Sequence, residues 1–123
     1  MNIFTTLARH PRLLRRWSAF GGVLLFRGEL DPRARELLIL RTAWNCGTDY
    51  EWAHHVEIGQ ASGLTAEEIA RVPGPIDPSA WSEADALLLR AADELHETAT
   101  LSDPTWAALA ASSTDAQLIE LCM

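Results

Sequence analysis

The feature that most constrains the fold is a segment near residue 40 that is apolar on every side. Asp31-Pro32 marks the start of a helix, because an acidic side chain caps the first turn and proline suits its first position. Residues 32–45 continue with helical spacing, and the run Leu37–Leu40 has no polar face. Such a helix must be covered by other elements. We therefore expect residues 32–45 to form a central, buried helix.

The rest of the chain carries helical signals and no strand signal. The Gly21-Gly22 pair interrupts one helical pattern and has two interpretations, a close approach to another helix or a break. The other expected helices span residues 3–9, 11–26, 50–61, 65–72, 82–96 and 114–123. A further helix is expected around Trp106, Leu109 and Ala110, with Ser102-Asp-Pro104 as its cap. The expected fold class is all-α, in a single domain over residues 1–123 with its core motif at 31–72.

Charge is unevenly distributed along the chain. The net charge is −7, yet residues 1–41 hold eight of the ten arginines and three of the seventeen acidic residues. Arg9, Arg12, Arg15 and Arg16 follow amphipathic spacing, which favours a solvated or subunit-contacting face over a nucleic-acid surface. Because the protein is acidic overall, no nucleic-acid partner is expected.

Cysteine content and hydropathy predict the compartment. Cys46 and Cys122 are too few for a disulfide scaffold, and both stand in apolar segments that favour burial. No apolar run reaches the roughly 18 residues that cross a bilayer. Arginines interrupt the apolar core that a signal peptide would need within residues 1–27. A soluble, cytoplasmic protein without a membrane partner is expected.

Two carboxylates and a histidine stand close together in the central part of the sequence. Glu51 and His55 are four residues apart and so share one helix face. Glu36 is either a half-exposed acid paired with Arg33 or a carboxylate in a pocket, with its pKa raised by apolar surroundings. An imidazole beside a carboxylate is a general acid–base pair near neutral pH.

Metal and thiol chemistry have weaker signals. Glu51–His54 is an E-x-x-H motif with a loose counterpart at Asp93–His96, and such short motifs are too common to predict a metal site. Cys46 ends an apolar helix, where the helix dipole disfavours a thiolate, and the chain has no C-x-x-C. No metal site is expected.

The sequence around these residues resembles the carboxymuconolactone decarboxylase family, whose all-helical fold is shared with alkylhydroperoxidase D. The resemblance is strongest over residues 33–72 and extends more loosely over most of the chain. It implies a helical bundle built around a central helix hairpin. Four stretches carry it: Arg35-Glu-Leu-Leu-Ile-Leu-Arg41, Asn45-Cys-Gly, Tyr50-Glu-Trp-Ala-His-His-Val56 and Gly63-Leu-Thr-Ala-Glu-Glu-Ile69.

The resemblance separates two branches of chemistry. The peroxidase branch has a glutamate, a C-x-x-C pair beginning twelve residues later, and a histidine four residues beyond the second cysteine. Aligning Glu36 with that glutamate puts Thr48 and Glu51 at the cysteine positions and His55 at the histidine. Neither Thr48 nor Glu51 can exchange disulfides. The decarboxylase branch likewise lacks the cysteines and places an acid before the histidine.

By resemblance, Glu36, Glu51 and His55 are the expected catalytic residues. Glu51 and His55 would move a proton to or from a small organic acid or lactone without a cofactor, and Glu36 would tune His55 or relay a proton to it. Substrate contact is implied for three neighbours: Thr48, Tyr50 and Trp52. A decarboxylase-like lyase is favoured. The alternatives are a peroxiredoxin-type antioxidant activity that uses Cys46, and a non-catalytic family member.

The resemblance also bears on assembly. Family chains commonly form trimers or hexamers and usually continue with a further helix, whereas residues 117–123 stop in mid-pattern. We therefore expect the C-terminal helix to be truncated. Leu118, Ile119 and Leu121 would then lack partners unless another subunit covered them. The expected partners are a small-molecule substrate and other copies of this chain.

Overall fold

The structure is a computed structural model that describes residues 3–123. This part of the chain contains eight helices and no strand, so the all-α prediction is confirmed. None of these helices is both long and apolar enough to cross a membrane. The helices are α1 (Ile3–Leu7), α2 (Pro11–Phe26), α3 (Pro32–Asn45), α4 (Asp49–Ala61), α5 (Ala66–Arg71), α6 (Glu83–Thr98), α7 (Asp103–Ala110) and α8 (Asp115–Cys122).

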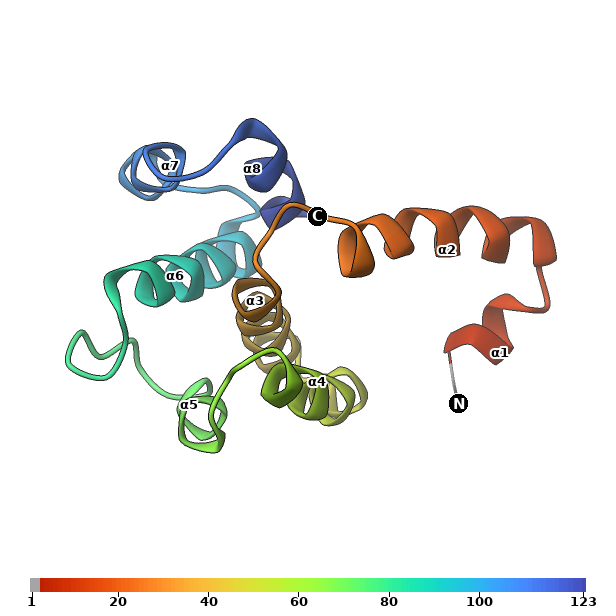
Figure 1. Cartoon of the computed structure of the whole chain (residues 1–123), viewed down its shortest axis with the longest axis horizontal. Helices are drawn as coiled ribbons and strands as arrows, with labels where there is room; N and C mark the ends of the chain where they lie inside the picture. Colours follow the sequence, from red (N-terminus) through yellow and green to blue (C-terminus); the bar gives the residue numbers. More distant parts are fainter. Residues whose placement is uncertain (1–2) are drawn as a thin grey trace.

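Helix α3 lies at the centre of the body, as its apolar run predicted. The Asp31 carboxylate accepts hydrogen bonds from the backbone N–H groups of Arg33 and Ala34 and so caps the helix. Helices α4 and α6 pack along two sides of α3 (Figure 1). Leu37 and Leu40 have no exposed surface, and they belong to a core cluster with Leu64, Ile69, Val72, Trp81 and Leu89.

A buried arginine ties α3 to α6 and to the loop after α5. Arg41 is 8% exposed and makes a forked pair with Asp93, at 2.6 Å from Nε and 2.7 Å from Nη2. Its Nη1 donates to the backbone carbonyls of Val72 and Gly74. These contacts fix α3 against α6 and against the loop that follows α5.

Two glycines shape the α3–α4 hairpin. Gly47 adopts a φ of +62°, a left-handed conformation that turns the chain sharply between the helices. Gly59 is buried on α4, and a Cβ atom there would lie 3.1 Å from Leu64 Cδ1 and 3.4 Å from Leu40 Cδ1. Because it has no side chain, α4 packs closely against α3.

Helix α2 leaves the body and carries α1 at its far end (Figure 1). It is continuous through Gly21-Gly22, so the interpretation of this pair as a break is wrong. A Cβ atom at either glycine would meet no other atom of the described chain within 4 Å, so close helix packing within the chain does not explain the pair either. Large apolar side chains stand exposed on α1 and α2: Ile3, Phe4, Leu13, Trp17, Phe20, Val23 and Phe26.

The C-terminal helix α8 finds most of its partners within the chain. Leu118 is 6% exposed and packs with Ala91 and Leu109, and Leu121 packs against the same cluster. Ile119 is 64% exposed. The expectation that all three side chains would lack partners is therefore wrong for Leu118 and Leu121, because α6 and α7 cover them.

Candidate functional site

A buried carboxylate–imidazole pair joins α3 to α4. Glu36 has no exposed surface, and its Oε2 lies 2.6 Å from Nδ1 of His55, which is 9% exposed. The close packing at Gly59, one turn after His55, brings α4 within reach of Glu36. With Glu36 ionised, Nδ1 of His55 is the donor in this hydrogen bond. Nε2 is then the ring nitrogen free to exchange a proton with another group.

Glu36 also receives a hydrogen bond from its neighbour on α3. Nε of Arg35 donates to Oε1 of Glu36 at 2.9 Å. Burial raises the pKa of Glu36, but the hydrogen bonds and positive charge of His55 and Arg35 outweigh it and hold the pKa below its usual value. Glu36 is therefore a carboxylate at neutral pH.

Both sequence interpretations of Glu36 are wrong in detail. Arg33 does not pair with it; its guanidinium binds Asp85 at 2.7 Å and Glu68 at 2.6 Å instead. The pKa of Glu36 is lowered rather than raised. A raised pKa would follow from the apolar helix alone. His55 on α4 and the adjacent Arg35 supply two hydrogen-bond donors that the sequence does not place at Glu36.

Glu51 extends this pair to the surface. Its Oε2 lies 3.6 Å from Nε2 of His55, and its side chain is 46% exposed. The predicted pairing across one turn of α4 is present. The structure thus brings all three residues with expected catalytic roles into one line, which runs from the buried Glu36 through His55 to the solvent-exposed Glu51.

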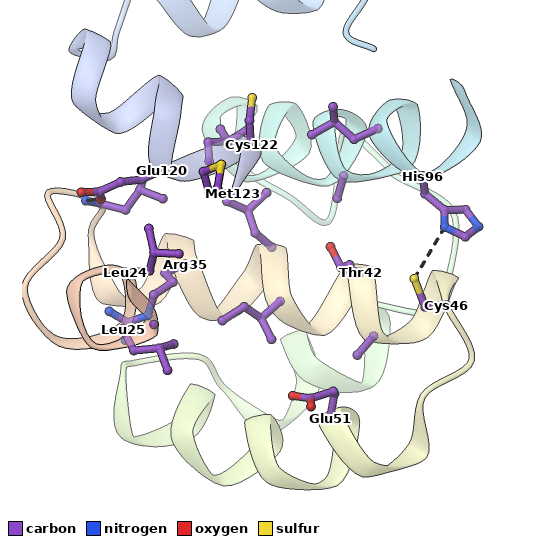
Figure 2. A pocket seen from close by; sticks show the side chains of 18 of the residues that line it. Leu24, Leu25, Arg35, Thr42, Cys46, Glu51, His96, Glu120, Cys122 and Met123 are labelled. Carbon is purple, nitrogen blue, oxygen red and sulfur yellow. Dashed lines mark hydrogen bonds between the residues drawn. The ribbon is translucent and has the colours of Figure 1, made fainter. Parts of the chain in front are cut away.

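Glu51 lies at an open groove of about 830 Å³. Helices α2, α3, α6 and α8 contribute to its walls, which are largely apolar. Figure 2 shows Arg35 and Cys46 towards opposite ends of the α3 face of this groove, with Thr42 between them and Glu51 on α4 below. A groove of this size accommodates a small organic molecule.

The three residues with expected substrate contact are separated by the structure. Thr48 lines the groove, and its Oγ1 is buried without a hydrogen-bond partner among residues 3–123. Tyr50 is 41% exposed and meets the ring of His54 edge-on. Trp52 packs edge-on against Trp44 and against the core cluster. Within the described chain neither Tyr50 nor Trp52 lines the groove, so their contact with substrate stays a prediction.

Sequence reasoning missed a thiol–imidazole pair at the other end of the groove. Cys46 and Cys122 are both exposed, so the expected burial of these residues is wrong. Sγ of Cys46 lies 3.8 Å from Nδ1 of His96, which stands in the last turn of α6 (Figure 2). The sequence holds no local signal for this contact, because it depends on how α6 packs beside α3.

The weak metal motifs do not converge. Over residues 3–123 no group of three or more His, Cys, Asp or Glu side chains is placed to hold a metal ion. His54 points to Tyr50 on the exposed side of α4, and Asp93 is engaged by Arg41 and Asn45.

Comparison with known proteins identifies a family. The chain matches the model of the carboxymuconolactone decarboxylase family over residues 11–94, a span that includes Glu36, Glu51 and His55. No curated protein and no solved structure matches it. The resemblance seen in the four sequence stretches is therefore confirmed at the level of the family.

Proposed function

The chain belongs to the carboxymuconolactone decarboxylase family, and from that premise we propose that it is a lyase that transfers protons on a small organic acid or lactone. One observation carries the proposal. A buried, ionised carboxylate orients an imidazole whose other nitrogen faces Glu51, which lies at an apolar groove. This is the arrangement that general acid–base catalysis requires.

The contacts support a division of roles among the three residues. Glu36 fixes the His55 tautomer and stabilises the imidazolium form when His55 takes up a proton. Nε2 of His55 lies 3.6 Å from Oε2 of Glu51, so a small shift of either side chain lets a proton pass between them, and Glu51 is the one of the three that lines the groove. Because Glu51 is half exposed, it can also return a proton from solvent after each turnover.

These groups supply the proton that the decarboxylation step consumes. The C–C bond to the departing carboxylate breaks and carbon dioxide leaves, while the bonding electron pair moves into the carbonyl system of the lactone as an enolate. Glu51, which lines the groove and can take up a proton from Nε2 of His55 or from solvent, then protonates the carbon. Thr48 lines the groove, and its buried hydroxyl has no hydrogen-bond partner among residues 3–123, so rotation of the side chain would offer a donor to the enolate oxygen. The largely apolar walls favour loss of a charged carboxylate as a neutral gas. Tyr50 and Trp52 remain candidates for ordering the ligand from α4.

The pair of Cys46 and His96 favours a second candidate function, hydroperoxide reduction. The thiol would give its proton to His96, and its sulfur would attack the O–O bond. That attack yields a sulfenic acid and an alcohol, whose oxygen receives the proton from His96. A low-molecular-weight thiol would then condense with the sulfenic acid to a mixed disulfide and release water. A second molecule of that thiol would attack the mixed disulfide, which frees Cys46 and releases the disulfide of the two small thiols. The absence of cysteine at positions 48 and 51 removes the usual dithiol of the peroxidase branch.

The two functions, and the non-catalytic alternative, are separated by assaying carboxymuconolactone and an organic hydroperoxide side by side. We expect wild-type protein to release carbon dioxide and Cys46→Ser to retain most of that activity, because the thiol takes no part in the proton transfer. If Cys46→Ser abolishes hydroperoxide turnover while Glu51→Gln does not, the acid–base proposal is wrong. A non-catalytic protein would turn over neither compound, and neither would raise its melting temperature.

We also propose that the chain forms a homo-oligomer through α1 and α2. Leu13 and Phe26 are 48% and 83% exposed, on an element that leaves the body (Figure 1). Residues 1–27 carry five arginines and no acidic residue, whereas residues 42–123 carry fourteen acidic residues and two arginines. This segment therefore complements the body of a second copy in charge, and pairing would cover its apolar side chains.

Sedimentation tests the assembly. We expect wild-type protein to sediment as an oligomer and the double variant Leu13→Asp, Phe26→Asp to sediment as a monomer. The melting of the α3–α4–α6 body should be retained, because α2 packs little against it. A wild-type chain that stays monomeric at concentrations where it melts cooperatively contradicts the proposal.

A further inference from the structure

The guanidinium group of Arg35 stands beside the proton-transfer residues with two donors unused. Arg35 lines the groove, and its side chain is 17% exposed. Its Nε is bound to Glu36, but within residues 3–123 its Nη1 and Nη2 donate no hydrogen bond. Each carries N–H donors in the plane of the guanidinium group.

The other arginines of α3 show what a structural arginine does in this fold. The Nη atoms of Arg33 donate to two carboxylates, Asp85 and Glu68. Arg41 donates to Asp93 and to two backbone carbonyls. Arg35 differs from both because its Nη atoms make no hydrogen bond between helices among residues 3–123, and because the residue lines the groove.

The charges around Arg35 also leave room for an anion. Glu36 is the only carboxylate bound to Arg35 among residues 3–123, through Nε alone, and it is shared with His55. Glu51 also lines the groove, but over the same residues it pairs with Nε2 of His55, at 3.6 Å, and not with Arg35. Glu120 lines the groove too, but its Oε2 accepts hydrogen bonds from the backbone N–H groups of Glu29 and Leu30, and it makes no ion pair with Arg35 in the described chain. The apolar lining nearby includes Leu24, Leu25 and Ile39.

We infer that Arg35 binds a carboxylate of the ligand, one that is retained through the reaction, and so selects organic acids over neutral lactones. The inference rests on the proposed function, since it takes the groove beside Glu51 as the ligand site. A guanidinium fork matches a carboxylate in a two-point contact. The carboxylate bound there cannot be the one that departs, because stabilising it in the ground state would oppose loss of carbon dioxide. The departing group therefore lies further along the groove, towards Glu51 and Thr48.

The test uses two probes that differ only in charge. One is a five-membered unsaturated lactone that carries an acetate side chain, and the other is the same lactone as its primary amide. Neither holds a second carboxyl group to lose, so binding is measured without turnover. Calorimetric titration of the wild-type chain should show the acid binding about 10- to 100-fold more tightly than the amide, as a charge-assisted hydrogen bond would give.

Substitution assigns that preference to a residue. Arg35→Met should remove most of the preference for the acid and leave affinity for the amide unchanged. Arg35→Lys keeps a positive charge beside Glu36 without the planar fork, and should keep the fold while losing most of the preference. Arg90→Met is the matched control, an exposed arginine on α6 away from the groove, and should bind both probes as wild type does.

Three outcomes overturn the inference. In the first, the wild-type chain binds acid and amide with equal affinity, and in the second, Arg35→Met keeps the preference for the acid. The third outcome is that Arg35→Met loses affinity for both probes equally, which would mean that Arg35 only supports Glu36. Glu51→Gln separates this result from the proposed function. Glu51→Gln should keep the preference for the acid, although it lacks the proton donor. If it also keeps turnover, the proposed proton transfer is wrong while the inference on Arg35 stands.

Discussion

Glu51→Gln is expected to lower kcat for the release of carbon dioxide from carboxymuconolactone by about 10²- to 10⁴-fold, the usual contribution of a general acid–base group. A glutamine amide has nearly the shape of the carboxyl group but neither takes up nor releases a proton near neutral pH. Since the side chain is 46% exposed, the free energy of unfolding should change by no more than about 0.5 kcal/mol. Steady-state kinetics and urea unfolding of the same preparation measure both effects.

The matched control for this substitution is Glu57→Gln. Glu57 is an exposed acid on α4 that lies outside the line from Glu36 to Glu51, so its loss should leave kcat and the free energy of unfolding close to wild type. Equal losses of kcat in the two variants would mean that the negative charge of α4 as a whole matters rather than a proton at Glu51. Full activity in Glu51→Gln would remove this residue from the mechanism.

Glu36→Gln is expected to lower the free energy of unfolding by about 2–4 kcal/mol, because it leaves a buried donor of His55 or Arg35 without an ionised acceptor. Glu36 is completely buried and uses both oxygens, Oε2 with His55 and Oε1 with Arg35. A glutamine can accept through one oxygen, but its amide nitrogen then faces a second donor. Urea denaturation at neutral pH, followed by circular dichroism, measures the difference.

The same substitution should change the response to acid. Glu36 has its pKa held below the ordinary 4.5 in the folded chain, so its contribution to stability is complete above pH 4.5 and is lost as the pH falls through the lowered value. Burial raises the pKa of Asp93, but the hydrogen bonds from Arg41 and Asn45 outweigh it and hold the pKa below the ordinary 3.8. Protonation of Asp93 therefore also lowers the stability, at a lower pH. Wild type should therefore lose stability steeply below about pH 4.5. The slope should be shallower in Glu36→Gln, and parallel curves for the two proteins would show that Glu36 is not the ionised partner.

Much of the fold was predictable because its signals are local. Asp31-Pro32 starts α3, Thr65 with Glu68 forms the capping box of α5, and Gly63 follows the end of α4 with a φ of +101°. Each of these depends on residues within one turn of the chain. The direction of α2 was not predictable, because its exposed apolar residues have the same helical spacing as a buried face.

The candidate site divides in the same way. The pairing of Glu51 with His55 follows from helical spacing, and the family resemblance predicted that Glu36 belongs to the same site. The pKa direction of Glu36, the unused donors of Arg35 and the contact of Cys46 with His96 depend on how separate helices pack. Apolar pattern predicts which side of a helix is buried, but it does not show which polar groups meet there.

The tautomer of His55 tests the central claim most directly. If Glu36 is the ionised acceptor at 2.6 Å from Nδ1, the neutral imidazole carries its proton on Nδ1 and presents an unprotonated Nε2 to Glu51. Long-range proton–nitrogen correlation spectra of the imidazole ring distinguish the two tautomers, and His55→Asn assigns the signals. We predict that the neutral ring of His55 is protonated on Nδ1, and that this preference is lost in Glu36→Gln. A neutral ring protonated on Nε2 would contradict the account, because Glu51 would then face a nitrogen that cannot accept its proton.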